Sequence, residues 1–454
     1  MGQENNQILE QVNTCSAPSE LKITDIRFTD IIGAPMNCTL MKIYTNQGIV
    51  GLGEVRDGAS RTYASMLKSR LLGENPCNVD KLFRRIKQFG GVSRQAGGVC
   101  GVEIALWDLA GKAFGVPVYQ LLGGKFRDKV RIYCDTDVEG KHTGKEMGEA
   151  LKKRMEKGFT FLKMDLGLSL LHGEKGALNA PLGYLEETDA LRRALSQAKT
   201  PEERRYWQNR CYDRQNIAHP FTWVHLTEKG FDILENYVRE VREVIGYEIP
   251  LAIDHFGHIG VEDCIKLCRR IEKYNIAWAE DMIPWQYTDQ YIRLSQSTTV
   301  PICTGEDIYL KEGFLPLLQS RGVSIIHPDL LSSGGILENK KIGDLAQEHG
   351  VAMAVHMAET PVTAYAAVHS VAATENFLVC ENHSVDVPWW NDITLGTPKQ
   401  IVEHGFIAVP DRPGLGVDDY NDEVIREHLH PDFPELWAST EMWDKEHSND
   451  MLWS

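Results

Sequence analysis

The chain has 454 residues, enough for two domains, and its hydrophobic content of 43% and charged content of 25% are ordinary for a globular protein. A formal net charge of −16 argues against nucleic-acid binding, because such binding rests on a basic surface. The first residues resemble no signal peptide, no apolar run is long enough to span a membrane, and ten scattered cysteines are typical of a reducing compartment. We therefore predict a cytoplasmic protein that binds neither nucleic acid nor membranes.

The N-terminal part of the sequence predicts a small α+β domain over residues 21–128, after a polar tail at 1–20. A strand-like pattern begins at Leu21. Residues Asn46 to Gly48 separate two runs of alternating apolar and polar residues, as in a β-hairpin. Helical patterns follow the hairpin at residues 63–72, 80–89 and 99–114.

Residues 129–383 alternate between strand and helix patterns. Two apolar runs, at 130–135 and 159–165, flank a helical pattern at 144–157. Six further apolar runs lie between Leu251 and Glu381, and each of these six ends in a carboxylate or a histidine. The helical patterns between the six runs lie at residues 261–274, 286–297, 311–321, 336–350 and 360–374. This alternation predicts an α/β fold with a (β/α) barrel, whose active site lies at the carboxyl ends of the strands.

The alternation is interrupted once, after the second barrel strand. Asp165 and Asp254 are 89 residues apart, so residues 166–223 form an insertion before the helix predicted at 228–244. Because the insertion leaves the carboxyl end of a strand, we interpret it as a lid or an oligomer contact, with the lid favoured. Residues 384–454 are expected to pack on the first domain and on the barrel.

Asp254, Glu280 and Glu306 end three consecutive predicted barrel strands. Converging carboxylates repel one another, and their pKa values rise unless a cation neutralises them. Oxygen-only ligands favour Mg²⁺, with Mn²⁺ as the alternative, over zinc. Helix caps or surface carboxylates would explain any one of the three residues alone, but not all three in phase.

Two further strand ends suggest acid–base chemistry. Asp329 and His356 end neighbouring strands, which suits a hydrogen-bonded dyad in which the aspartate fixes the imidazole tautomer and raises its basicity. Glu381 ends the last strand, where it is expected either to contact substrate oxygens or to pair with a lysine.

The residues at these strand ends resemble the mandelate racemase branch of the enolase superfamily. The similarity includes Asp254, Glu280-Asp281, the TGE ending at Glu306, the HPDLLSSGGI run with Asp329, and His356. In the first domain, IVGLGEV (49–55) and EIALWDLAGKAFGVPVYQLLGG (103–124) are similar to the capping domain of that family. The resemblance implies a modified (β/α)₇β barrel with an N-terminal capping domain.

It also implies a mechanism. Mg²⁺ held by Asp254, Glu280 and Glu306 would bind the substrate carboxylate, and His356, oriented by Asp329, would remove the α-proton. The metal would stabilise the resulting enediolate, as in the general description of this superfamily. Glu381 matches the last-strand glutamate that contacts the developing enediolate in relatives. A homo-oligomer is expected from the family alone.

The second barrel strand departs from the family pattern. Many members carry Lys-x-Lys there, whereas this chain has Lys163-Met164-Asp165. Residues 163 and 165 share a strand face, so both are candidates for the pocket. A carboxylate in place of the second lysine argues against racemisation, which needs a competent group on each face of the substrate. It leaves dehydration open, because one histidine can serve as base and then as acid.

Two histidines in DHFGH, His255 and His258, are further candidates for acid catalysis or substrate binding. With the family resemblance, these residues imply a Mg²⁺-dependent dehydratase, a hydro-lyase that converts an aldonate or aldarate into a 2-keto-3-deoxy acid. The alternatives are a cycloisomerase or epimerase of a hydroxy acid or sugar lactone, and a non-catalytic sugar-acid binding protein. The loops at 31–37 and 56–61 and the insertion are expected to determine which sugar acid binds.

Overall fold

The structure of the protein is a computed structural model, and it describes residues 16–171, 173–181, 183–217, 224–254 and 259–445. The chain forms two compact units. The first unit comprises Met1–Cys134, Gly305–Leu318 and Ile326–Ser454, and the second comprises Asp135–Thr304 and Gln319–Ile325. The domain boundaries stated above stay a prediction, because this division follows packing and separates the barrel strands into two groups.

The first unit contains an antiparallel sheet in the order β1-β2-β3. Strand β2 ends at Thr45 and β3 starts at Val50, and Tyr44 is paired with Val50, so the predicted hairpin is confirmed. Gly48 has a φ of 77°, which an L-residue adopts only with strain. The strands span Ile23–Ile31 (β1), Cys38–Thr45 (β2) and Val50–Val55 (β3).

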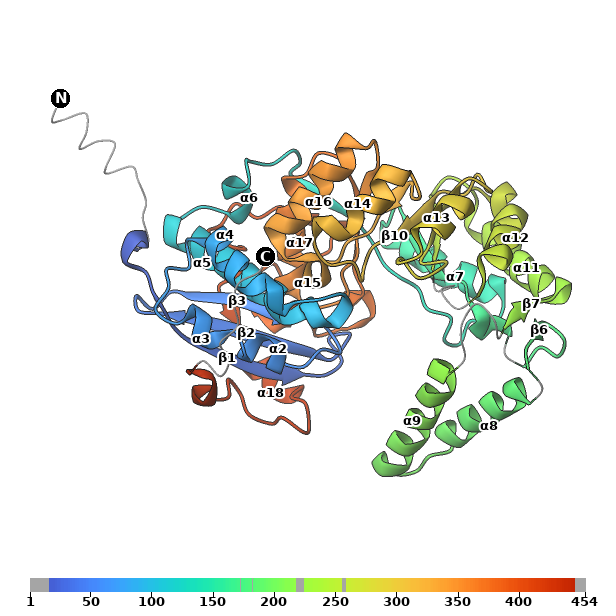
Figure 1. Cartoon of the computed structure of the whole chain (residues 1–454), viewed down its shortest axis with the longest axis horizontal. Helices are drawn as coiled ribbons and strands as arrows, with labels where there is room; N and C mark the ends of the chain where they lie inside the picture. The colour runs from blue at the N-terminus through green and yellow to red at the C-terminus, as the bar shows by residue number, and fades with distance from the viewer. Residues whose placement is uncertain (1–15, 172, 182, 218–223, 255–258, 446–454) are drawn as a thin grey trace. The chain divides into compact units, whose positions relative to one another are not determined.

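Helix α5 (Gly97–Phe114) packs directly on this sheet, as the blue ribbons of Figure 1 show. A Cβ atom on Gly53 would lie 2.4 Å from the carbonyl oxygen of Gly101, so the backbones of β3 and α5 approach more closely than side chains permit. Leucine, isoleucine, valine and phenylalanine side chains from β1, β2, α4 and α5 form the core here. The other helices are α2 (Thr62–Ser65), α3 (Lys68–Leu71), α4 (Val79–Ile86) and α6 (Val118–Leu121).

The first unit also contains parallel strands in the order β4-β13-β12, with β15 antiparallel at the outer edge of β4. Glu381, the last residue of β13, pairs with Tyr133 of β4. The strands span Lys129–Tyr133 (β4), Ala352–Val355 (β12), Phe377–Glu381 (β13) and Phe406–Ala408 (β15). The helices of this part are α15 (Leu330–Ser333), α16 (Ile336–Glu348) and α17 (Pro361–Ala372).

The last part of the chain contacts the antiparallel sheet of the same unit. The hydroxyl of Tyr420 donates to the carbonyl oxygen of Gly53 at 2.6 Å, and the amide of Ala438 donates to that of Phe28 at 3.1 Å. The short elements in this region are β14 (Thr394–Leu395), β16 (Asp419–Tyr420) and α18 (Asp422–Glu427).

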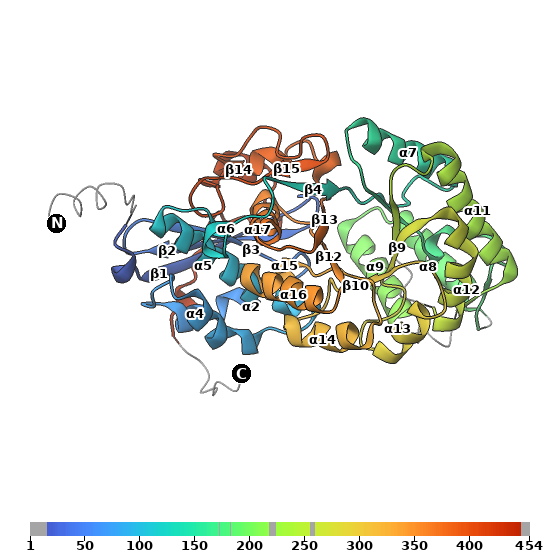
Figure 2. The same cartoon turned by 90° about the horizontal axis from the view of Figure 1, so that it is seen from above.

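The second unit is built on parallel strands in the order β10-β9-β8-β5. Strands β9 and β10 are labelled in Figure 2, with helices of the same unit beside them. The strands span Leu162–Asp165 (β5), Leu251–Asp254 (β8), Ile276–Glu280 (β9) and Ile302–Thr304 (β10). The helices are α7 (Gly144–Glu156), α11 (Glu228–Ile245), α12 (Val261–Ile271) and α13 (Thr288–Ser295). Two elements cross the boundary between the units, α14 (Leu310–Ser320) and β11 (Ile325–Ile326).

The inserted segment forms a helical hairpin. Helices α8 (Tyr184–Ser196) and α9 (Pro201–Ile217) pack against each other, as the green ribbons of Figure 1 show. No residue of α8 is buried. Short strands β6 (Leu178–Asn179) and β7 (His225–Leu226) pair on either side of the hairpin in the sequence.

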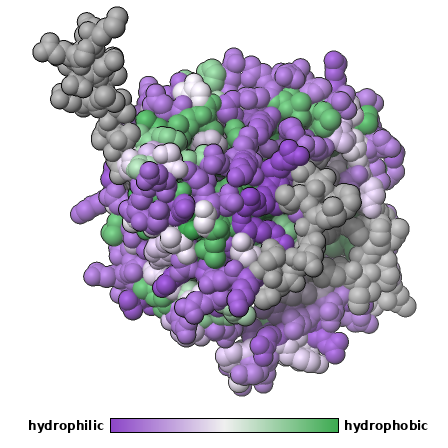
Figure 3. All heavy atoms as spheres, turned by 60° about the vertical axis from the view of Figure 1, so that its left-hand side comes forward, coloured by the Kyte–Doolittle hydropathy of each residue, from purple (hydrophilic) through white to green (hydrophobic). Residues whose placement is uncertain are grey.

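The face in Figure 3 is mostly hydrophilic, with apolar residues in small scattered groups. In the part of the chain that the structure describes, no helix is both long enough and apolar enough to cross a membrane.

Candidate active site

The dyad predicted from the sequence forms in the first unit. Asp329 precedes α15 as its N-cap, and one carboxylate oxygen accepts from the amide of Leu331 at 2.6 Å. The other oxygen lies 2.6 Å from Nδ1 of His356, which directly follows β12. Asp329 is fully buried and His356 is 8% exposed. A helix amide thus fixes one oxygen of the aspartate, and the other oxygen orients the histidine.

The charge of Asp329 determines the tautomer of His356. Burial raises the pKa of Asp329, but Arg56 and His356 outweigh burial, so the pKa lies below its ordinary value and the group is a carboxylate. A carboxylate only accepts hydrogen bonds, so Nδ1 of His356 carries the proton. In the neutral ring, Nε2 then has the free lone pair that a general base requires.

Two more carboxylates lie on the Nε2 side of His356. Nε2 lies 3.3 Å from an oxygen of Glu306 and 3.7 Å from one of Glu381. Burial lowers the pKa of His356, but Glu306, Glu381 and Asp329 outweigh burial and raise it well above its ordinary value. The structure thus brings together all four residues predicted from these strand ends: Glu306, Asp329, His356 and Glu381.

The sequence reasoning missed two histidines in this cluster. Nε2 of His383 lies 3.3 Å from Glu381, and the ring centroid of His383 is 6.3 Å from that of His356. His327 Nε2 lies 2.9 Å from the hydroxyl of Tyr133 and 3.8 Å from Glu381. Both histidines stand two residues from a predicted site residue, on the same side of an extended chain. That alternation was the available signal.

Arg56 and Glu359 were also missed. Arg56 follows β3, is 1% exposed, and forms ion pairs with Asp329 and with Glu359, the latter at 3.0 Å. Burial raises the pKa of Glu359, and the neighbouring Asp329 adds to the effect, so the pKa lies well above its ordinary value. A charged residue directly after the apolar VGLGEV strand was the only sequence signal for Arg56.

The second unit holds the other predicted group. Nζ of Lys163 lies 2.7 Å from an oxygen of Asp254 and 3.4 Å from both oxygens of Glu280. The indole nitrogen of Trp278 donates to Glu280 at 2.8 Å. Lys163 is 1% exposed, Asp254 5% and Glu280 0%. The lysine therefore neutralises two buried carboxylates that would otherwise repel each other.

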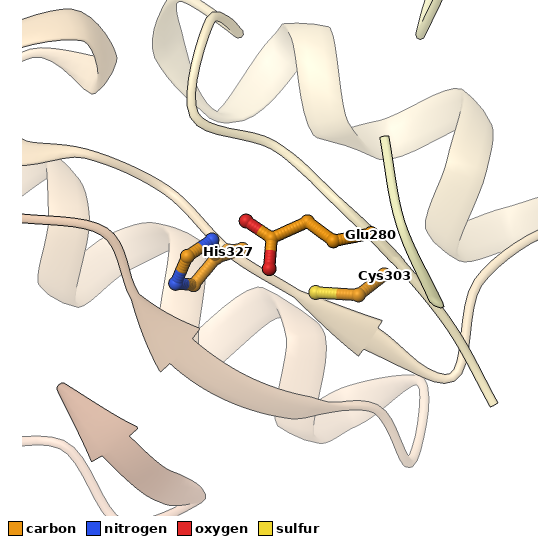
Figure 4. A group of neighbouring side chains, drawn as sticks. All are labelled: Glu280, Cys303 and His327. Carbon is orange, nitrogen blue, oxygen red and sulfur yellow. The ribbon is translucent and has the colours of Figure 1, made fainter. Parts of the chain in front are cut away.

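The donor set in this unit suits a hard divalent cation. Asp254, Glu280 and Asp281 each offer an oxygen, and the three atoms lie within 4.8 Å of one another. Figure 4 shows Glu280 and Cys303 side by side on β9 and β10, where they are partners in the parallel ladder. Negatively charged carboxylate oxygens are the ligands that Mg²⁺ and Mn²⁺ prefer.

Asp165 ends β5 and pairs with Asp254 in the parallel register, which places it at the same end of the strands. Its catalytic role stays a prediction. His255 and His258, the other predicted candidates, lie outside the described residues.

Known proteins share this architecture over most of the chain. Residues 27–123 match the mandelate racemase / muconate lactonizing enzyme N-terminal domain, and residues 146–423 match the family described as enolase C-terminal domain-like. A mandelate racemase/muconate lactonizing enzyme-like protein from Rubrobacter xylanophilus superposes with a TM-score of 0.74 at 28% identity. The superposition covers 91% of this chain and 99% of that one. The predicted capping domain and modified (β/α)₇β barrel are therefore confirmed.

Curated relatives are similar at the sequence level. The D-xylonate dehydratase of Haloferax volcanii is 32% identical over 406 residues, which cover 88% of this chain and 87% of the relative. The D-galactonate dehydratase of Pectobacterium atrosepticum is 27% identical, over 87% of this chain and 91% of the relative. This chain therefore belongs to the mandelate racemase/muconate lactonizing enzyme family of enolase-like proteins.

Proposed function

We propose that the protein is a hydro-lyase that dehydrates a sugar acid to a 2-keto-3-deoxy acid. The observation that carries the proposal is the His356–Asp329 dyad, whose Nε2 faces Glu306 and Glu381 within one cluster. The relatives named D-xylonate and D-galactonate dehydratase support the same reaction and suggest an aldonate as the substrate.

The cofactor in this proposal is Mg²⁺, with Mn²⁺ as the alternative. Asp254, Glu280 and Glu306 would supply the ligands, as the family resemblance implies, and the oxygen-only set in the second unit supports this choice. When bound, a divalent cation supplies positive charge that neutralises the substrate carboxylate and the negative charge that develops on it.

Side chains of the protein carry out the proton transfers and contact the substrate. His356 takes the proton from C2 on Nε2, because Nδ1 already carries the proton that it donates to Asp329. The protonated His356 then donates to the hydroxyl that leaves C3. Glu381 would contact the substrate oxygen atoms on which negative charge develops, and we assign Lys163 and Asp165 to the opposite side of the substrate. These assignments, a homo-oligomeric state and a cytoplasmic location stay predictions.

A substrate screen tests the proposal. Purified protein with Mg²⁺ is incubated with a panel of aldonates, aldarates and uronates that includes D-xylonate and D-galactonate, and 2-keto acids are detected as semicarbazones. We expect turnover of at least one aldonate, loss of turnover with EDTA, and recovery when Mg²⁺ or Mn²⁺ is added back. No 2-keto acid from any member of the panel would contradict dehydration.

The same samples distinguish the alternative functions. NMR in D₂O would detect deuterium exchange at C2 without loss of water, which is the result expected of an epimerase. A new lactone or ring-opened product would identify a cycloisomerase, and binding without any exchange would identify a binding protein.

A further inference from the structure

Arg56 is buried in the first unit, next to the dyad and to two further acidic side chains. Its Nη1 forms an ion pair with Asp329 and lies 3.0 Å from Oε1 of Glu359, while its Nε lies 3.2 Å from Oδ1 of Asp57. The side chain is 1% exposed. A buried charge is tolerated only where such partners compensate its lost hydration. Arg56 thus has a fixed geometry rather than a mobile one.

Counting hydrogens shows what this geometry does to the dyad. Nη1 of Arg56 carries two hydrogens, and it donates one to an oxygen of Asp329 and the other to Oε1 of Glu359. Nδ1 of His356 lies 3.2 Å from the same nitrogen, so no hydrogen of Nη1 is left for it. The imidazole must therefore supply its own proton on Nδ1, and it directs this proton to Asp329 at 2.6 Å.

We propose that Arg56 is a positioning residue for the reaction, one that fixes the Asp329 carboxylate so that His356 keeps its proton on Nδ1 and presents Nε2 to the substrate. The kinetic part of this inference rests on the proposed function. The hydrogen-bonding part does not, because it concerns the protein without substrate.

Gly97 allows Arg56 to occupy this position. It begins α5, and a Cβ atom there would lie 2.5 Å from Cβ of Arg56 and 2.7 Å from its backbone nitrogen. Gly97→Ala should therefore displace Arg56 without removing its charge. Gly111 on the same helix provides a matched control, because a Cβ atom there would lie 2.7 Å from Cα of Gly414 and makes no close approach to Arg56.

Steady-state kinetics with the sugar acid found in the screen form the first test. Arg56→Lys keeps the charge but replaces the planar fork by a single nitrogen. We expect kcat to fall about 10–100-fold in Arg56→Lys and in Gly97→Ala, as for other residues that orient a functional side chain, while KM changes little. Gly111→Ala should lose a similar amount of stability and keep kcat. Equal kcat values in Gly97→Ala and Gly111→Ala would overturn the proposal.

The second test needs no substrate. In protein labelled with ¹⁵N-histidine, the ring nitrogens of His356 are identified by their loss in His356→Asn. We expect the Nδ1 proton of His356, which is hydrogen-bonded to Asp329, to give the same resonance in the wild type and in Gly111→Ala, and to be shifted or lost by exchange in Arg56→Lys and Gly97→Ala. A wild-type histidine spectrum in the latter two variants would overturn the positioning role. This result is independent of the substrate screen, so the two proposals can fail separately.

Discussion

His356 lies between a fixed carboxylate on its Nδ1 side and two carboxylates on its Nε2 side. We expect His356→Asn to lower kcat by about 10²–10⁴-fold, because the variant loses the proton acceptor that the dyad orients, while it still binds the sugar acid. Steady-state kinetics and calorimetric titration measure the two properties.

His369→Asn is the matched control for this prediction. His369 is another fully buried histidine of the same unit, and burial lowers its pKa to about 4, so it is neutral and structural. Its Nδ1 accepts from the amide of Tyr119 at 3.3 Å. Below the unfolding temperature, this variant should keep its kcat. Normal turnover in His356→Asn would refute the assignment of the base.

Lys163 allows a different prediction, which concerns stability. In the metal-free protein it neutralises Asp254 and Glu280, both buried, so Lys163→Met should destabilise the protein by roughly 3–5 kcal/mol, the cost of breaking a buried ion pair. A cation bound to the same carboxylates would replace the lost charge. We therefore expect added Mg²⁺ to raise the melting temperature of Lys163→Met more than that of the wild type.

Lys68→Met provides the comparison. Lys68 is 2% exposed and belongs to the first unit, where it is paired at 2.6 Å with Asp25, which is not a predicted ligand. This variant should lose stability that Mg²⁺ does not restore. If Mg²⁺ raised the melting temperatures of both lysine variants equally, the cation would not bind at Asp254 and Glu280.

The residues that the sequence predicted correctly as neighbours are those at the ends of apolar runs. Asp329 and His356 could be paired in advance because consecutive parallel strands end at the same edge of a sheet. Arg56 could not, because its partner Asp329 lies 273 positions away and no local pattern encodes that contact. The same holds for Lys163: the sequence placed it on the second barrel strand, but the register of β5 and β8 decides that it meets Asp254.

At the scale of elements, Glu54 joins β3 to the start of α17. Its carboxyl accepts from the hydroxyls of Thr360 at 2.6 Å and Thr363 at 2.8 Å, and from the amide of Thr360. Glu54 is fully buried, and burial raises its pKa to about 7, although these hydrogen bonds oppose the increase.

A raised pKa has a defined effect on stability. Between pH 4.5 and about 7, the folded protein holds the proton of Glu54 while the unfolded chain releases it, so this contribution falls as the pH rises. The contribution of this proton to the free energy of unfolding is fully present below pH 4.5 and amounts to about 3 kcal/mol.

Glu54→Gln tests this prediction, because glutamine is neutral at every pH. We expect the difference in unfolding free energy between variant and wild type to shift by about 3 kcal/mol in favour of the variant from pH 4.5 to pH 8. Denaturant unfolding at several pH values measures the difference, and other titrating groups cancel in it. A difference that does not change with pH would show that Glu54 has an ordinary pKa.

Element positions were predictable where the hydrophobic period is strong. The helix predicted at 228–244 is α11, Glu228–Ile245, and the helix predicted at 144–157 is α7, whose start is fixed by a capping box between Thr143 and Glu146. The helix predicted at 63–72 instead forms two short helices, α2 and α3. Apolar spacing alone did not reveal that break.

At the scale of the whole molecule, the sequence located the insertion from the interrupted strand spacing, but not its structure. The segment forms the hairpin of α8 and α9, which the apolar pattern did not predict, because every side chain described between residues 184 and 214 is exposed or only partly buried. Tyr206 and Tyr212 on α9 are each 52% exposed. Such a hairpin contributes little to the core of its unit, which agrees with either interpretation of the insertion, a lid or an oligomer contact.

Replacing residues 184–217 by a short Gly/Ser linker distinguishes the two interpretations of this hairpin. Because α8 has no buried residue, we expect the melting temperature to change little. A lid that closes over substrate would give a variant with altered kcat and KM and an unchanged oligomeric state, and this is the result we expect. Light scattering after size-exclusion chromatography measures the oligomeric state. A variant with normal kinetics but a smaller assembly would instead identify the hairpin as the oligomer contact, since removing a subunit interface lowers the mass without touching the dyad.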